Sequence, residues 1–224
     1  MKNSSYGFVR LDASMADDLS VVNAARVSFA TSSSELTDAD LGLIKFLMRE
    51  RHGTPFEHNS FRFHIKCPLF VAREWFRHRI GSFNEYSARY SKFDGEFYIP
   101  ERDAVRSQVG KPGAYTFETI EDEETAQLLI DKIAETNLLM YGRYESLLKQ
   151  GVAKELARAV LPVTMYTQFY WTVNARSLMN FLSLRTDQNA LLEIREYASD
   201  VESYFAAEMP HTYAAWIENG KVTP

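Results

Sequence analysis

The chain has 224 residues, of which 46% are hydrophobic, including 15 Phe and 12 Tyr. This composition predicts a sizeable folded core and excludes a disordered or fibrous chain. The formal net charge of −5 argues against nucleic-acid partners and against an anionic membrane, since both favour basic surfaces. With Cys67 as the only cysteine, no internal disulfide framework or Cys-rich zinc site is expected.

The expected compartment follows from features that the sequence lacks. Residues 1–10 contain no apolar run of a signal peptide, and no stretch of about twenty apolar residues occurs. A lone cysteine suits a reducing environment. We therefore expect a soluble cytoplasmic protein with no membrane partner.

The first third of the chain predicts two helices, a strand and a short helix. Residues 14–29 predict a helix opened by Ser14, and residues 37–49 predict a second helix from their three-and-four apolar spacing. Residues 60–67 alternate apolar and polar side chains, which predicts a half-buried strand. Pro68 then begins a short helix that runs through Phe76.

A loop and a long helix follow. Residues 94–113 contain three Gly and two Pro, so we expect a surface loop after a short strand at 96–99. Residues 123–149 predict a long helix with an apolar stripe. Three leucines of that helix lie off the stripe, and oligomerisation would explain a second buried face: Leu128, Leu138 and Leu139.

The last third predicts a short helix, a strand and two helices. Pro162 ends the helix at 154–161, and aromatic and β-branched residues mark the strand at 166–173. The final helices are expected at 175–184 and 190–209, with Pro210 ending the second. No repeat or long linker divides the chain. We therefore predict one α+β domain over residues 1–224, with an antiparallel sheet packed against long helices.

The most informative segment is residues 77–90, with the sequence RHRIGSFNEYSARY. It gathers three arginines, a histidine, a carboxylate, an amide and two serines directly after a helical apolar segment. Guanidinium groups bind phosphate and carboxylate through paired hydrogen bonds, and Ser, Asn and Glu side chains can bind the edge of a heterocycle. The alternative is a solvated loop that forms salt bridges with some of the 30 acidic residues.

The spacing of this segment resembles the signature of the flavin-dependent thymidylate synthases: Arg-His-Arg, two residues, Ser, one residue, Asn-Glu, one residue, Ser, one residue, Arg-Tyr. The resemblance extends over roughly residues 8–210, with the sequence AARVSF at 24–29 as its first landmark. It implies methylation of dUMP to dTMP with FAD, NADPH and 5,10-methylenetetrahydrofolate, and release of tetrahydrofolate. It also implies a homotetramer with active sites at subunit interfaces.

The resemblance also implies which residues contact FAD. The second flavin segment is the run WTVNARSLMNFL at 171–182, in which Arg176 and Asn180 are four residues apart and share a helix face. The alternative role of Asn174 is purely structural, as the N-cap of this helix. No Gly-x-Gly-x-x-Gly turn occurs, so the FAD site is not expected to be Rossmann-like. The implied FAD contacts are Thr54, Arg77, His78, Arg79, Glu85, Asn174, Ala175, Arg176 and Asn180.

A second set of residues is implied to contact dUMP. Arg89 suits the phosphate dianion. For Arg158 the alternative is a structural role as one member of a buried ion pair. Many members of the family carry glutamine where this chain has Glu74; ionised glutamate can only accept hydrogen bonds, and it could simply pair with a nearby arginine. The implied dUMP contacts are Glu74, Trp75, Phe76, Arg77, Glu85, Tyr86, Ser87, Ala88, Arg89, Arg158 and Arg185.

Arg185 is the implied catalytic residue. By the resemblance, its guanidinium faces the N3 and O4 edge of uracil and stabilises negative charge that develops there. The alternative is a purely structural role, because a cation at the C-terminus of a helix interacts favourably with the helix dipole. Cys67 has no motif around it and reads as a small buried hydrophobe, so a route without a cysteine nucleophile fits the chain. The redox chemistry would reside in the flavin.

Two other functions compete with this hypothesis. Arginines interleaved with Phe83, Tyr86 and Tyr90 could form a stacking platform for a nucleotide or single-stranded RNA, although the acidic balance weakens this reading. A flavoprotein reductase with another substrate would share the cofactor. A metal site is not expected, because the histidines at His52 and His58 match no standard zinc spacing.

Overall fold

Strand β1 (Phe8–Met15) begins close to the start of the described part of the computed structural model, which comprises residues 7–224. Helix α1 (Asp18–Arg26) follows, capped by the Asp17 carboxylate, which accepts a hydrogen bond from the Ser20 amide at 2.6 Å. The predicted helix over 14–29 was therefore wrong at its start. Both Ser14 and Asp17 are chemically suitable caps, and apolar spacing alone did not distinguish them.

The described residues divide into two compact units. The sheet unit comprises residues 8–65, 74–84 and 169–224, and the α4 unit comprises Gly7 and residues 66–73 and 85–168. The α+β class is confirmed, with antiparallel pairing in its sheets. The single-domain assignment and the homotetramer stay predictions.

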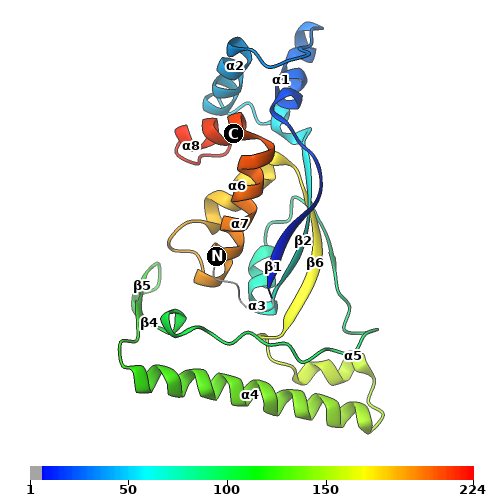
Figure 1. Cartoon of the computed structure of the whole chain (residues 1–224), viewed down its shortest axis with the longest axis vertical. Helices are drawn as coiled ribbons and strands as arrows, with labels where there is room; N and C mark the ends of the chain where they lie inside the picture. Colours follow the sequence, from blue (N-terminus) through cyan, green and yellow to red (C-terminus); the bar gives the residue numbers. More distant parts are fainter. Residues whose placement is uncertain (1–6) are drawn as a thin grey trace. The chain divides into compact units, whose positions relative to one another are not determined.

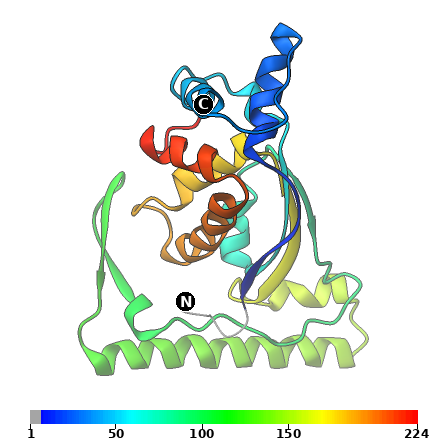
Figure 2. The ribbon, with the colours of Figure 1, turned by 45° about the horizontal axis from the view of Figure 1, so that its top comes forward.

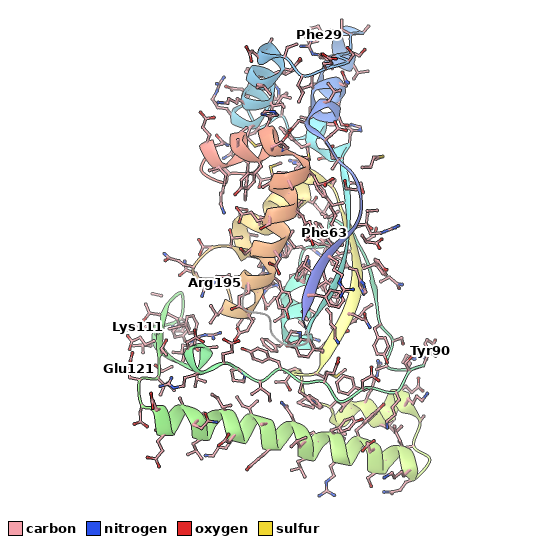
Figure 3. All side chains as sticks on the ribbon, in the orientation of Figure 1. Phe29, Phe63, Tyr90, Lys111, Glu121 and Arg195 are labelled. Atoms are coloured by element: carbon pink, nitrogen blue, oxygen red, sulfur yellow. The ribbon has the colours of Figure 1, made fainter. Side chains whose placement is uncertain are left out.

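Four strands form one sheet in the order β1-β2-β6-β3, of which Figure 1 labels the first three. Strands β2 (Ser60–Pro68) and β6 (Tyr166–Val173) match the predicted ranges, whereas β3 (Ser82–Glu85) lies inside the segment expected to be a loop. Three side chains on one face of β2 are fully buried, as the alternation predicted: Phe61, Phe63 and Ile65 (Figure 3). Phe63 stacks on Trp171 of β6 with ring centroids 5.7 Å apart.

Helices complete the sheet unit. Helix α2 (Asp38–Arg49) begins at the Thr37 capping box, and α6 (Ala175–Arg185) packs against α7 (Leu192–Glu208). Short helix α3 (Leu69–Trp75) ends at a fully buried Trp75, which stacks on Phe181 of α6 with centroids 4.7 Å apart. Single 3₁₀ turns span Val27–Phe29 and Thr54–Glu57.

The C-terminal helix α8 (Pro210–Glu218) was not predicted. Pro210 was expected to end the preceding helix, but it occupies the first turn of a new one, where its missing N–H costs nothing. The buried carboxylate of Asp18 accepts hydrogen bonds from the Thr212 amide at 2.7 Å and the Thr212 hydroxyl at 2.6 Å. Helix α1 thus supplies the cap of α8 from 194 residues away in sequence.

The α4 unit is organised by helix α4 (Glu123–Lys149), whose bounds match the prediction. Its apolar stripe packs on a buried cluster that contains Phe93, Phe97 and Tyr144. Helix α5 (Lys154–Ala157) and a 3₁₀ turn (Arg158–Val160) replace the single helix expected at 154–161. The three leucines off the stripe are exposed, with Leu138 at 71%.

A β-hairpin in the α4 unit replaces the predicted surface loop (Figure 2). Strands β4 (Arg106–Lys111) and β5 (Ala114–Thr119) pair antiparallel, and Gly110 and Gly113 at the turn have φ of +106° and +87°. The glycines marked a turn correctly, but the strands that flank it are exposed on both faces and lack apolar alternation. The strand expected at 96–99 is only an isolated bridge between Phe97 and Met165, followed by a 3₁₀ turn at Arg102–Ala104. Within residues 7–224 no helix is long and apolar enough to cross a bilayer.

Candidate active site

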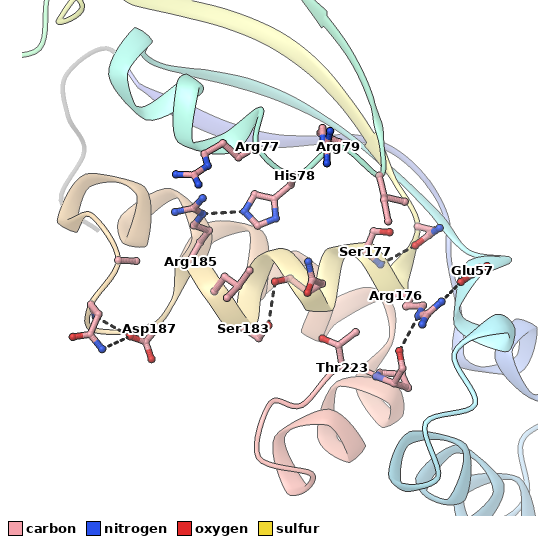
Figure 4. A pocket seen from close by; sticks show the side chains of 17 residues that line it. Glu57, Arg77, His78, Arg79, Arg176, Ser177, Ser183, Arg185, Asp187 and Thr223 are labelled. Atoms are coloured by element: carbon pink, nitrogen blue, oxygen red, sulfur yellow. Dashed lines mark hydrogen bonds and ion pairs between the residues drawn. The ribbon is translucent and has the colours of Figure 1, made fainter. Parts of the chain in front are cut away.

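The sheet unit contains a cavity of about 1070 Å³, and most of the residues that line it are polar or charged (Figure 4). One wall follows the end of α3, another is formed by α6 and the turn after it, and a third comes from residues near 224. The lining residues are Glu57, Arg77, His78, Arg79, Ile80, Asn174, Arg176, Ser177, Asn180, Ser183, Leu184, Arg185, Asp187, Asn189, Ala190, Thr223 and Pro224.

The α3 wall depends on one buried anchor. Trp75 is fully buried, and the chain leaves the helix directly after it, so Arg77, His78 and Arg79 emerge together at the cavity (Figure 4). The His78 amide donates to the Trp75 carbonyl at 3.0 Å, which fixes this exit. Core packing of Trp75 therefore fixes the chain two residues before Arg77, where the predicted Arg-His-Arg triplet begins.

The α6 wall presents residues at helical spacing. Asn174 caps the helix, because its side-chain oxygen accepts a hydrogen bond from the Ser177 amide at 2.8 Å. The structural role considered for this residue is therefore confirmed. Arg176 and Asn180 lie four residues apart and both line the cavity. Arg185 ends the helix on the same cavity.

Arg176 is held by two protein acceptors. Its Nε donates to the Pro224 carbonyl at 2.8 Å, and its guanidinium pairs with Glu57. A Cβ on Gly53 would lie 2.5 Å from this Nε, so glycine is required for the guanidinium to occupy its place. The two contacts use two of the five N–H donors of a guanidinium that lines the cavity.

Arg185 is the most enclosed of the cavity arginines for which an ion pair is described, with 15% of its side chain exposed. Its Nε donates to Nε2 of His78 at 2.9 Å. One terminal nitrogen donates to the Glu74 carboxylate at 2.9 Å, and the other donates to the Glu74 carbonyl at 3.1 Å. Glu74 also lies 3.9 Å from a terminal nitrogen of Arg77.

The cavity carries net positive charge and keeps His78 neutral. Burial of the imidazole and the charges of Arg185 and Arg77 lower the pKa of His78 to about 4, against a smaller opposing effect of Glu74. Four arginines line the space, and two carboxylates, Glu57 and Asp187, line it with them. An anionic, hydrogen-bonding ligand suits this surface.

Six of the other predicted residues belong to the α4 unit. Glu85 accepts a hydrogen bond from the Thr167 hydroxyl at 2.7 Å, and the Tyr86 amide donates to the Gln168 carbonyl at 2.8 Å. Ala88 is buried, while Arg89 pairs with Glu155 at 3.1 Å and its amide approaches the Ser87 hydroxyl at 3.4 Å. Arg158 begins the 3₁₀ turn after α5.

Comparison with known proteins decides the family. A family profile described as "Thymidylate synthase complementing protein" matches residues 10–211. The flavin-dependent thymidylate synthase of Thermosipho africanus is 49% identical over 212 residues, which cover 95% of this chain and 91% of that protein. The chain belongs to the flavin-dependent thymidylate synthase family. The Thermotoga neapolitana member is 48% identical, with the same two coverages.

Solved structures agree with the family assignment. A UMP/dUMP methylase, PolB from Streptomyces cacaoi, bound with 5-Br dUMP, has a TM-score of 0.90 and 41% identity, and the match covers 97% of each chain. A second structure of PolB, bound with 5-Br UMP, has a TM-score of 0.90 and 40% identity over 97% and 96% of the two chains.

For this member of the flavin-dependent thymidylate synthases, seven predicted residues share the cavity: Arg77, His78, Arg79, Asn174, Arg176, Asn180 and Arg185. Thr54, Glu74, Trp75, Phe76 and Ala175 do not line it, although Glu74 pairs with Arg185 and Arg77, which do. Among the described residues, no group of three or more His, Cys, Asp or Glu side chains could hold a metal ion.

Sequence reasoning missed several lining residues of the cavity. Helical spacing from Asn180 could have indicated Ser183 and Leu184 on the same face of α6. Glu57 lies between His52 and His58, in a segment whose histidines match no standard zinc spacing. Nothing in the sequence pointed to Thr223 and Pro224, because they lie 38 and 39 positions beyond the end of α6 and carry no motif.

Proposed function

We propose that this chain catalyses the reductive methylation of dUMP to dTMP, with FAD as cofactor and NADPH and 5,10-methylenetetrahydrofolate as co-substrates. Tetrahydrofolate is the expected folate product. The observation that carries the proposal is the arginine-lined cavity, assembled from both signature segments in a chain of this family. The PolB structures with 5-Br dUMP support the substrate class.

The cavity fits a flavin dinucleotide. Its volume of about 1070 Å³ lies at the upper end of ordinary ligand pockets, as a dinucleotide requires. Its arginines suit a pyrophosphate, and the amides of Asn174 and Asn180 suit polar ring or ribose atoms. We assign FAD to Arg77, His78, Arg79, Asn174, Arg176 and Asn180, with Thr54, Ala175 and Glu85 as further proposed contacts. When bound, reduced FAD would supply a hydride to the uracil ring, and the folate would supply only the one-carbon unit.

We assign dUMP to Trp75, Phe76, Arg77, Glu85, Tyr86, Ser87, Ala88, Arg89, Arg158 and Arg185, with Glu74 as a neighbour of this site. Arg89 pairs with Glu155 while both side chains are more than half exposed, so exchanging that carboxylate for a phosphate dianion costs little. Such a pair keeps the arginine extended and available.

Arg185 is the proposed catalytic residue. A guanidinium that is mostly buried acts at a lower local dielectric than one in water, so it stabilises charge on the uracil O4 and N3 edge more strongly. His78, neutral at physiological pH, adds no competing positive charge. The protein thus polarises the pyrimidine through fixed donors.

Cys67 does not supply a nucleophile in this proposal. Burial and the nearby Glu85 charge raise the pKa of the Cys67 thiol well above its usual value, so the reactive thiolate is disfavoured. The side chain is also fully buried. Activation of uracil therefore rests on electrostatics.

The assembly proposed is a cytoplasmic homotetramer with active sites at subunit interfaces. The exposed Leu128, Leu138 and Leu139 on α4 support an apolar contact beyond this chain. Light scattering at micromolar concentration should give the mass of four chains. A monodisperse monomer would contradict this assembly.

Product identification tests the proposed function. Flavin-loaded protein is incubated anaerobically with NADPH, methylenetetrahydrofolate and either dUMP or UMP, and the nucleotide and folate products are separated by mass spectrometry. We expect dTMP and tetrahydrofolate in equal amounts. NADPH oxidation that ignores added nucleotide would indicate a reductase with another substrate. Salt-sensitive binding of single-stranded RNA without turnover would indicate a binding module.

A further inference from the structure

Three acceptors hold the Arg185 guanidinium, one at each of its nitrogens: Nε2 of His78, the Glu74 carboxylate and the Glu74 carbonyl. A guanidinium has five N–H donors, so two remain for the cavity that Arg185 lines. We propose that Glu74 and His78 are positioning residues, which hold Arg185 in the orientation that meets the pyrimidine edge. This inference rests on the proposed function, because it assigns Arg185 to that edge.

Glu74 is placed for this role by the end of α3. The carbonyls of a helix's last turn have no partner within the helix, and the negative end of the helix dipole lies there. Arg185 takes the Glu74 carbonyl and the Glu74 carboxylate together, so one residue supplies two of the three acceptors. Trp75, buried next to it, keeps this turn from moving.

His78 supplies the third acceptor. For Nε2 to accept from Arg185, the ring must be neutral with its proton on Nδ1. The ring packs edge-to-face on Phe181 with centroids 4.9 Å apart, which fixes its plane. The low pKa of His78 agrees with a permanently neutral acceptor.

By this proposal, Glu74 acts on dUMP through Arg185 and does not contact the substrate directly. Its carboxylate oxygen Oε2 is shared between Arg185 at 2.9 Å and Arg77 at 3.9 Å. A carboxylate so engaged offers less to uracil than a free one, and ionised glutamate has no donor for the uracil carbonyls. Glutamine would keep one acceptor oxygen for Arg185, so it should substitute for Glu74 with little loss.

A double-mutant cycle tests whether Glu74 acts through Arg185. The affinity of flavin-loaded protein for dUMP is measured by calorimetry for wild type, Glu74→Ala, Arg185→Ala and the double variant. We expect Glu74→Ala to weaken binding 10- to 100-fold alone but less than twofold in the Arg185→Ala background. Glu74→Gln should stay within threefold of wild type. Equal losses from Glu74→Ala in both backgrounds would show direct contact with dUMP and overturn the proposal.

A second readout does not depend on the substrate. Phenylglyoxal modifies accessible arginines, and peptide mapping gives the rate at Arg185 in ligand-free protein. We expect Glu74→Ala to raise that rate at least tenfold. Glu218→Ala is the matched control, because it removes an exposed carboxylate that pairs with Lys45, and it should change nothing.

The two readouts separate the possible failures. An unchanged modification rate in Glu74→Ala would overturn the positioning role even if the enzyme methylates dUMP. A raised rate in a protein that neither binds nor methylates dUMP would leave Glu74 holding Arg185 and refute the proposed function instead. If Glu74→Ala does not fold, the same cycle and mapping with His78→Ala apply, with the same outcomes expected.

Discussion

One methyl group at Gly53 would test the cofactor side of the cavity. A Cβ there would lie 2.5 Å from Nε and 2.6 Å from Cζ of Arg176, whereas ordinary contact begins at 3.4 Å. The guanidinium must therefore move by about 1 Å, which takes the 2.8 Å hydrogen bond from Nε to the Pro224 carbonyl beyond useful length. The backbone itself does not resist, since Gly53 has φ −73° and ψ −32°, which alanine adopts readily.

The size of the effect follows from what Arg176 donates. A hydrogen bond to a charged group contributes about 1.5–3 kcal/mol, which corresponds to about 10- to 150-fold in affinity. Gly53→Ala should therefore weaken FAD binding by that factor while leaving the fold intact. The displaced atoms are at the end of a flexible side chain, so the thermal midpoint should change by only a few degrees.

The assay is titration of flavin-free protein with FAD, followed by the quenching of flavin fluorescence. Gly42→Ala in α2 is the matched control, because a Cβ there meets no atom within 4 Å. It should leave FAD affinity unchanged and stabilise the fold by about 0.5–1 kcal/mol, since alanine favours a helix interior. FAD affinity of Gly53→Ala within twofold of wild type would refute the role of Arg176.

Three further predictions concern the fold and the site. Phe63→Ala should lower the unfolding free energy by about 3–5 kcal/mol in urea, because Phe63 is fully buried; a loss under 1 kcal/mol would contradict its core position. The folded-state pKa of His78 is lowered to about 4, so the contribution of the neutral imidazole to the free energy of unfolding is fully present above pH 6.5 and is lost as the pH drops from 6.5 to 4. In flavin-free protein, His78→Asn should flatten the pH dependence of the unfolding free energy over this range. An unchanged slope would count against the lowered pKa of His78. Asp18→Ala should cost about 2–4 kcal/mol and raise hydrogen exchange of the Thr212 amide, whereas unaltered exchange would rule out the cap.

Regular segments could be predicted from the sequence where one physical signal dominates. The alternation from Phe61 to Ile65 and the β-rich run of β6 predicted strands with nearly correct ends, and the stripe of α4 predicted that helix over its full length. Each of these segments buries one face, and burial is what the pattern records.

The failures share a different cause. Helix α8 is capped by Asp18 of α1, a contact that no local pattern can reveal. The β4–β5 hairpin buries little, so its strands carry no alternation. Strand β3 lies in a segment whose polar residues suggested a loop.

The candidate site was predicted in part. The resemblance indicated residues of both signature segments, and the cavity joins Arg77–Arg79 to Arg176, Asn180 and Arg185. The wall formed by Thr223 and Pro224 was not predictable, because it depends on where the chain passes after α8. Pairing of Glu74 with Arg185 was foreseen only as a generic ion pair, since the arginine lies 111 residues away.

Tritium release from dUMP labelled at C5 tests the central claim most directly. Flavin-loaded wild type and Cys67→Ala are supplied anaerobically with NADPH and methylenetetrahydrofolate, and each component is omitted in turn. We predict release that requires both NADPH and the folate and that Cys67→Ala retains. No release from folded, flavin-loaded wild type, or release abolished in a folded Cys67→Ala, would contradict a methylation at C5 that needs no cysteine nucleophile.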